Sequence, residues 1–186
     1  MTQTALLVID IQRGAFDGAR CDPIDRPEAL VTSALSLLNA ARGSAIPIVF
    51  VQHCEGAGSP FEEGSVHGEV HEALAPRPGE AVLRKHASSA FEGTMLARLL
   101  EDMNAHELVL CGLQSEFCVA NTAKAALAQG FAVTIAQDGH GTWPWEGQSA
   151  EAIQQRVNTE LAQAGARLSP VADLAKSLRA IQTRPN

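Results

Sequence analysis

The sequence predicts an α/β protein with an open, mostly parallel sheet, and three observations lead to this fold class. Short apolar segments rich in β-branched residues alternate with segments whose apolar residues recur at helical spacing. The apolar segments lack the polar alternation of half-exposed strands, which indicates strands covered by helices on both faces. The chain has 186 residues, of which 46% are hydrophobic, and this fits one domain over residues 1–186. A β-α-β-α order of this kind implies right-handed crossovers between parallel strands.

The apolar segments and the helical stripes give the expected elements. We expect strands at residues 5–9, 46–51, 81–83, 108–111 and 131–136. The first helix is expected to have a capped start at Asp25, with Pro27 and Glu28 behind it, and to stop at Gly43. Four further helices are expected around residues 96–103, 119–129, 149–164 and 171–181. Residues 52–80 are rich in Gly and Pro and are expected to form a long functional loop, such as a lid or a binding wall.

Charge and cysteine spacing exclude several classes of function. The formal net charge is −7, and a nucleic-acid or anionic-membrane surface normally needs a basic stripe, so both partners are disfavoured. The four cysteines form no CxxC pair, which argues against a zinc knuckle or a redox dithiol. No GxGxxG or GxxxxGK[ST] motif follows the first strand, so nucleotide binding is disfavoured. We therefore expect a soluble cytoplasmic protein with reduced thiols, no signal peptide, no cofactor and a small-molecule substrate.

Three reactive side chains follow three of the expected strands: Asp10, Lys85 and Cys118. Because ligands bind beyond the carboxyl ends of the strands in open α/β sheets, these side chains are candidates for one site. Cys118 would begin a helix, whose N-terminus favours a thiolate, and a nearby ammonium group would lower the thiol pKa further. A carboxylate within reach could take the thiol proton. Each residue alone is also compatible with a structural role, and only their joint placement favours nucleophilic catalysis.

Several separated motifs stand in order along the chain: Leu7–Gln12, Val82–Lys85 followed by Ser89–Phe91, Gly112–Val119 with Thr122 and Ala123, and Asp138–Thr142. Together they resemble the isochorismatase-like cysteine hydrolases. The resemblance runs from about residue 5 to residue 142, and the order of the motifs makes it specific. It implies a six-stranded parallel, Rossmann-like three-layer fold and a homo-oligomer, either a dimer or a tetramer.

The resemblance also implies roles for the three reactive residues. Cys118 would be the nucleophile, Asp10 the general base and Lys85 the cation that stabilises the thiolate. A non-proline cis peptide bond is implied at Leu113–Gln114, with the backbone amides of Gln114 and Cys118 forming an oxyanion hole. The expected function is hydrolysis of a small amide, carbamoyl or related C–N bond through a thioester on Cys118. Two alternatives stay open: vinyl-ether hydrolysis of the isochorismatase type, and a catalytically silent binding member of the family.

Residues that would shape the substrate pocket are expected near these motifs. An apolar pocket with few charges suits a small neutral amide better than a dianion, although Arg13, Arg20 and Arg84 lie close to the site motifs and keep the vinyl-ether alternative open. The expected substrate-binding residues are Gln12, Phe16, Phe91, Gln114 and Trp143.

Nicotinamidases of the family carry a metal site, with an Asp and a His two apart after the second strand and a further His downstream. Here His53 and Glu55 stand at the first two positions, and His71 could be the third ligand. This departure weakens nicotinamidase as the activity, and no metal is expected. Whether His53, Glu55 and His71 bind a metal is left open by the sequence.

Overall fold

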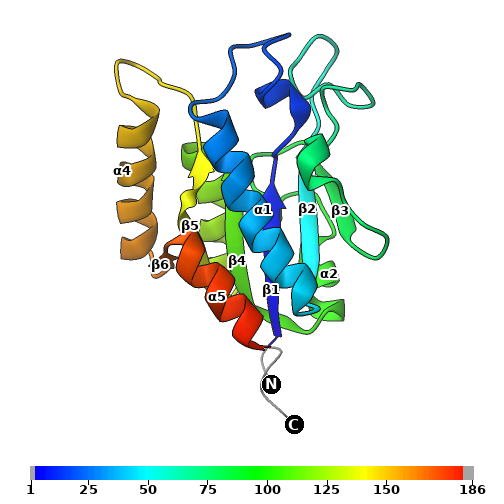
Figure 1. Cartoon of the computed structure of the whole chain (residues 1–186), viewed down its shortest axis with the longest axis vertical. Helices are drawn as coiled ribbons and strands as arrows, with labels where there is room; N and C mark the ends of the chain where they lie inside the picture. Colours follow the sequence, from blue (N-terminus) through cyan, green and yellow to red (C-terminus); the bar gives the residue numbers. More distant parts are fainter. Residues whose placement is uncertain (1–2, 182–186) are drawn as a thin grey trace.

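The computed structural model describes residues 3–181 and shows a six-stranded, all-parallel sheet between two layers of helices (Figure 1). The strand order is β3-β2-β1-β4-β5-β6, so the chain winds outward in both directions from the β1–β4 pair. The predicted α/β class with a parallel sheet is therefore confirmed. The sixth strand is short and was not among the strands expected from the apolar segments. The strands are β1 (Gln3–Ile9), β2 (Ile48–His53), β3 (Ala81–Lys85), β4 (Ala105–Leu113), β5 (Ala132–Gly141) and β6 (Arg167–Ser169).

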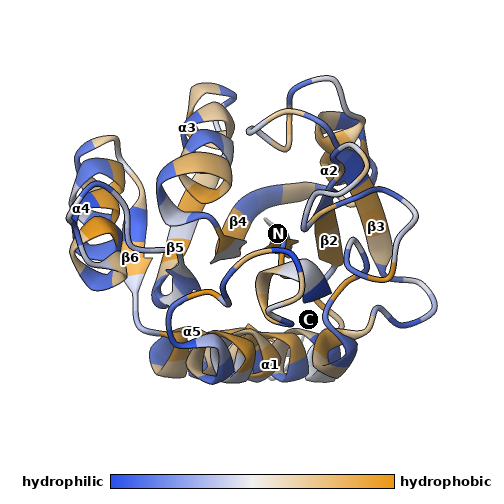
Figure 2. Cartoon of the chain, turned by 90° about the horizontal axis from the view of Figure 1, so that it is seen from above, coloured by the Kyte–Doolittle hydropathy of each residue, from blue (hydrophilic) through white to orange (hydrophobic). Residues whose placement is uncertain are grey.

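Helices cover both faces of the sheet, as Figure 2 shows from above. α1 and α5 form one layer, and α2, α3 and α4 form the other. Along β1 the buried side chains alternate between the two layers, because successive residues of a strand point to opposite faces. This double burial explains why β1 is apolar from Ala5 to Ile9. The helices are α1 (Pro27–Gly43), α2 (Leu96–Asp102), α3 (Ala120–Ala128), α4 (Ala150–Gln163) and α5 (Val171–Ile181).

The start of α1 differs from the prediction. The residue before the helix is Arg26 in a left-handed conformation with φ 49°, and its side chain makes no capping hydrogen bond. Asp25 does not cap the helix, because its carboxylate accepts a hydrogen bond from the Arg26 guanidinium at 3.0 Å. The expected capped start at Asp25 is therefore wrong, whereas Pro27 does begin the helix.

β2 and the edge strand β3 continue beyond their apolar segments into polar residues. β2 and β3 stay paired through Gln52↔Arg84 and His53↔Lys85. The predicted strands end too early because the prediction follows the apolar residues. The backbone hydrogen bonds that pair the strands do not depend on side-chain hydrophobicity and continue further. The extension places His53 and Lys85 side by side at the carboxyl edge of the sheet.

The segment between β2 and β3 is mostly loop, as predicted, with one 3-10 turn at Glu72–Leu74. Along the described chain, no helix combines the length and apolar character that a membrane crossing requires.

Candidate active site

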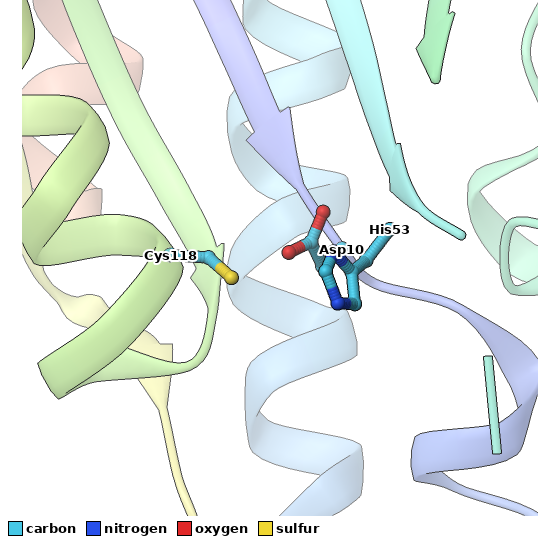
Figure 3. Close-up of side chains that lie close together, drawn as sticks. All are labelled: Asp10, His53 and Cys118. Atoms are coloured by element: carbon cyan, nitrogen blue, oxygen red, sulfur yellow. The ribbon is translucent and has the colours of Figure 1, made fainter. Parts of the chain in front are cut away.

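Asp10, Lys85 and Cys118 meet at the carboxyl edge of the sheet, where each follows or ends a different strand. Lys85 Nζ lies 2.8 Å from Asp10 Oδ2 and 3.1 Å from Cys118 Sγ. All three residues are buried, with exposed fractions of 2% for Asp10, 1% for Lys85 and 9% for Cys118. Asp10 and the Cys118 sulfur point toward one another from β1 and from the turn after β4 (Figure 3). The three residues that the sequence singled out are thus one cluster.

The backbone positions Asp10 and Cys118 through two local departures from regular structure. Asp10 adopts a left-handed φ of 52°, which ends β1 and which Asp tolerates better than most residues. After β4 the peptide bond between Leu113 and Gln114 is cis, and a π-helical turn over Ser115–Val119 follows. This turn carries Cys118 and leads directly into α3.

The Lys85 ammonium offsets part of the effect that burial has on the pKa of the Asp10 carboxyl group. Burial raises its pKa to about 6, and the Lys85 ammonium opposes part of this increase. Oδ2 receives the hydrogen bond from Lys85, whereas Oδ1 is buried and has no hydrogen-bond partner among the described residues. At neutral pH Asp10 is therefore an ionised carboxylate with one oxygen available to accept a proton.

The Cys118 thiol carries its proton at neutral pH. Burial raises its pKa to about 11, the Asp10 carboxylate adds to the increase, and the Lys85 ammonium opposes it. This differs from the expectation of a thiolate favoured by the helix start and by a neighbouring lysine. Removal from water and the adjacent negative charge therefore outweigh the Lys85 charge at this sulfur.

His53 and Glu55 extend the cluster toward the cavity mouth. His53 Nδ1 lies 3.1 Å from Lys85 Nζ and must accept that hydrogen bond, because an ammonium group only donates. The ring proton is therefore on Nε2, which lies 3.3 Å from Glu55 Oε1. Burial and the Lys85 charge lower the pKa of His53 to about 4, so its ring is neutral.

A cavity of about 250 Å³ opens onto the Cys118 sulfur. Its volume lies just below the roughly 300–1,000 Å³ that is usual for small-molecule sites, so it fits a small ligand. Phe61 and Ser88 were not predicted from the sequence, because neither belongs to a motif and the long loop brings Phe61 in from outside the sheet. The lining residues are Asp10, His53, Glu55, Phe61, Ser88, Leu113, Gln114, Phe117 and Cys118.

Of the five expected substrate-binding residues, only Gln114 lines this cavity. Gln12 is buried and bonds to the backbone of His53 and Gly68, which ties the long loop to β2. Phe16 stacks edge-on against His71, and Phe91 packs against Phe131.

Trp143 also lies away from the cavity lining. It packs against the core beneath α1 and α5 and donates from Nε1 to the Asp22 carbonyl at 2.7 Å. Proximity in sequence to a motif therefore did not predict which apolar side chains face the thiol.

The possible metal ligands also group differently from the sequence expectation. Among residues 3–181, Asp10, His53 and Cys118 are the group of possible ligands, with ligand atoms within 4.8 Å of one another. His71 belongs to no such group in this range, and its Nδ1 accepts a hydrogen bond from the Ala73 amide. Lys85 Nζ already contacts all three members of the group, so its ammonium supplies the positive charge there.

A buried polar chain braces the turn that carries Cys118. The Ser115 hydroxyl lies 2.8 Å from His140 Nδ1, and His140 Nε2 lies 3.0 Å from Asn158 Oδ1. Asn158 Nδ2 donates to the Gln137 carbonyl, so its oxygen must face His140 as an acceptor. The turn is thereby fastened to β5 and α4.

Comparison with known proteins decides the family. The profile of the family described as Isochorismatase domain matches residues 4–173. The chain belongs to the isochorismatase family. The family protein YddQ of Bacillus subtilis is 34% identical, over 75% of this chain and 78% of its own length. The crystal structure of an isochorismatase from Pseudomonas putida superposes with a TM-score of 0.85 at 27% identity, covering 92% of this chain and 89% of that one.

Other isochorismatase-family relatives are named for the reactions they catalyse. Streptothricin hydrolase of Streptomyces noursei is 34% identical over 75% of this chain, which spans 54% of that protein. Maleamate amidohydrolase of Pseudomonas putida is 32% identical, over 72% of this chain and 70% of its own length. The family is hydrolytic, and these relatives support a hydrolase of amide-type bonds.

Proposed function

We propose that this isochorismatase-family protein is a cysteine hydrolase that cleaves a small amide, carbamoyl or related C–N bond through a thioester on Cys118. One observation carries the proposal: Lys85 Nζ bridges Asp10 Oδ2 and Cys118 Sγ, while Asp10 Oδ1 is left without a partner among the described residues. The cation thereby contacts both the proposed base and the proposed nucleophile beside a cavity.

The first half of the reaction forms the thioester. Asp10 takes the proton of the Cys118 thiol as the sulfur attacks the carbonyl carbon, and the Lys85 ammonium stabilises the developing thiolate. The negative charge that builds on the carbonyl oxygen is received by the backbone amides of Gln114 and Cys118. The tetrahedral intermediate then breaks its C–N bond, and protonated Asp10 gives its proton to the departing nitrogen.

The second half regenerates the enzyme. Asp10, again a carboxylate, takes a proton from water as the water oxygen attacks the thioester carbon. The C–S bond breaks, the acid product leaves, and the Cys118 sulfur recovers a proton from Asp10. Each half-reaction moves one proton onto Asp10 and one off it, so the raised pKa of Asp10, about 6, suits both roles.

The alternative functions have less support. Arg13 pairs with Glu72, Arg20 with Glu62 and Arg84 with Glu63, and none of the three arginines lines the cavity. A dicarboxylate such as a vinyl-ether substrate would therefore lack a cationic partner apart from Lys85. A silent binding member would not need a buried ammonium group in contact with both a carboxylate and a thiol.

Replacement of the nucleophile tests the proposal. Cys118→Ala is expected to reduce ammonia release from a panel of small amides to the uncatalysed rate, because covalent catalysis needs the sulfur. Cys21→Ala is the matched control, since Cys21 lies outside the cavity lining and should keep full activity. Turnover by Cys118→Ala equal to that of the wild type would overturn the mechanism.

We also propose that residues 1–186 form a single domain that works in the cytoplasm. The four cysteines are free thiols, as a reducing compartment would keep them. Assembly into a dimer or tetramer stays a prediction, which sedimentation of the purified protein would check.

A further inference from the structure

The cavity around Cys118 is lined by two carboxylates, and only one of them is paired with a cation. Asp10 forms a salt bridge with Lys85, and both side chains are almost fully buried, at 3% and 0% exposure. This pair adds no net charge to the cavity. Glu55 is the second carboxylate, and its side chain is 37% exposed at the opening.

Neutral groups satisfy both oxygens of Glu55. Oε1 faces the Nε2–H of His53 at 3.3 Å, and Oε2 accepts a hydrogen bond from the Ser59 hydroxyl. His53 is neutral, because its Nδ1 accepts a hydrogen bond from Lys85. Among the described residues, no ammonium or guanidinium group forms an ion pair with Glu55. Its negative charge is therefore uncompensated within contact distance.

The cationic side chains of the neighbouring loop and strand are directed to other carboxylates. Arg84 lies 3.5 Å from Glu63, and Arg20 pairs with Glu62. The remaining lining residues carry no formal charge, and two of them, Phe61 and Phe117, offer aromatic rings. Counting Asp10 and Glu55 as −1 each and Lys85 as +1 leaves the cavity with one net negative charge. Aromatic faces also favour cations rather than anions.

We propose that Glu55 makes this pocket selective for cationic substrates: amides that carry an ammonium or guanidinium group within a few bonds of the scissile carbonyl. The cationic group pairs with Glu55 at the opening while the carbonyl lies at Cys118. Anionic substrates are repelled by the same carboxylate, since charge complementarity at a partly desolvated site governs both association and selection. This inference rests on the proposed function, because it names the substrate class of that site.

Thiol reagents of different charge test the selectivity without requiring amide hydrolysis. The probes are 2-aminoethyl methanethiosulfonate, which is cationic, and 2-sulfonatoethyl methanethiosulfonate, which is anionic. Each forms a mixed disulfide with Cys118 and releases methanesulfinate. The rate of modification is measured on the Cys118 peptide by mass spectrometry and divided by the rate for 2-mercaptoethanol. Lys85 alone would favour the anionic reagent, whereas Glu55 would favour the cationic one, so the two residues predict opposite preferences.

The wild-type protein is expected to prefer the cationic reagent over the anionic one by at least about tenfold after this correction. Glu55→Gln should lower the preference several-fold, because the amide keeps an oxygen for His53 and Ser59 but has no charge. Glu55→Asp should retain most of it. Glu63→Gln is the matched control, since it removes an exposed carboxylate of the same loop that does not line this cavity. The inference would be overturned if the ratio of cationic to anionic modification rates were no greater for the wild-type protein than for 2-mercaptoethanol. It would also be overturned if this ratio were unchanged in Glu55→Gln.

A pair of amide series separates this inference from the proposed function. The wild type is given ω-aminoalkanamides and uncharged alkanamides of matched length, and kcat/KM is measured for each. A cationic preference that depends on Glu55 supports the inference. Hydrolysis that requires Cys118 but shows no preference for either series overturns the inference and leaves the hydrolase function intact. Hydrolysis that persists in Cys118→Ala overturns the proposed mechanism, while the reagent test still decides the selectivity.

Discussion

Asp10 is the residue whose environment sets the protonation of the whole cluster. Burial raises the pKa of its carboxyl group, the Lys85 ammonium at 2.8 Å opposes part of this increase, and the resulting pKa is about 6. A general base works best when its pKa lies close to the working pH, because it must both take and return a proton. In the proposed reaction Asp10 receives the proton of the Cys118 thiol, whose pKa is about 11.

The pH dependence of catalysis should follow Asp10. Protonation of Asp10 removes the base, so kcat/KM is expected to fall below about pH 6, approaching tenfold for each further pH unit. The measurement is a pH profile of kcat/KM with an uncharged amide, corrected for acid unfolding. A profile that stays flat from about pH 7 down to about pH 5 would contradict the assignment of Asp10 as the base.

Replacing Asp10 should make the Cys118 thiol react faster with an alkylating reagent but make amide turnover by the protein slower. Asp10→Asn removes the negative charge that raises the thiol pKa while Lys85 remains, so alkylation of Cys118 by iodoacetamide near pH 8 should be faster. Amide turnover should fall by about 10²–10⁴, because asparagine cannot accept the proton. Asp102→Asn, on the exposed end of α2, is the control and should change neither rate. Slower alkylation in Asp10→Asn would show that the carboxylate does not hold the thiol protonated.

At the scale of elements, the last residues of β4 determine how closely it approaches β1. Gly112 has a φ of +130°, and a Cβ at this position would lie 1.9 Å from the Ile9 carbonyl oxygen. Only glycine therefore fits here. The close approach holds the end of β1, with Asp10, against the turn that carries Cys118.

Substitution at Gly112 should be costly for stability. Gly112→Ala is expected to lower the free energy of unfolding by about 3 kcal/mol or more, because the backbones of both strands must move apart. Gly141→Ala at the end of β5 is the matched control: its Cβ would have no neighbour closer than 3.5 Å. Urea unfolding of both variants makes the comparison. Equal stability of the two would contradict the packing constraint.

The strands and the loops differ in how much of them could be predicted from the sequence. The central parts of β1, β2, β4 and β5 are apolar on both faces, so these strands and their parallel pairing were predictable from hydrophobicity, whereas the short strand β6 was not. The polar ends of β2 and β3 were not, although they bring His53 and Lys85 to the site. The role of Gln12 as a loop tether and the positions of Phe16 and Trp143 depend on tertiary packing, which a local pattern does not carry.

At the scale of the whole molecule, the strand order assembles the cluster from distant parts of the chain. β3 is separated from β1 by β2, so the side chain of Lys85 must cross the end of β2 to reach Asp10. The three reactive residues were predictable from the sequence because each ends a strand or follows one closely, and an all-parallel sheet gathers those ends at one edge. Their distances and protonation states required the fold.

Breaking the buried ion pair should destabilise the whole fold. Lys85→Met leaves the Asp10 carboxylate buried without its cation, and a loss of about 3–5 kcal/mol is expected at neutral pH. The double variant Asp10→Asn/Lys85→Met should lose less, because it buries no unpaired charge.

Unfolding in urea at two pH values provides the measurement. The pKa of Asp10 is raised in the folded state, so its ionisation costs stability as the pH rises from its model value of 3.8 through about 6. Lys85→Met removes the cation that opposes this increase, so the pKa of Asp10 rises further in the variant, and its loss of stability should be smaller in acid than at neutral pH. A double variant less stable than Lys85→Met would contradict the account.

Trapping of the acyl-enzyme tests the central claim most directly. Wild-type protein is mixed with a small amide, quenched rapidly in acid, digested and weighed by mass spectrometry. One acyl group is predicted on the peptide that contains Cys118, with none on the peptides of Cys21, Cys54 or Cys111. An amide that is turned over while Cys118 never carries the acyl group, or an acyl group on another residue, would contradict catalysis by this thiol.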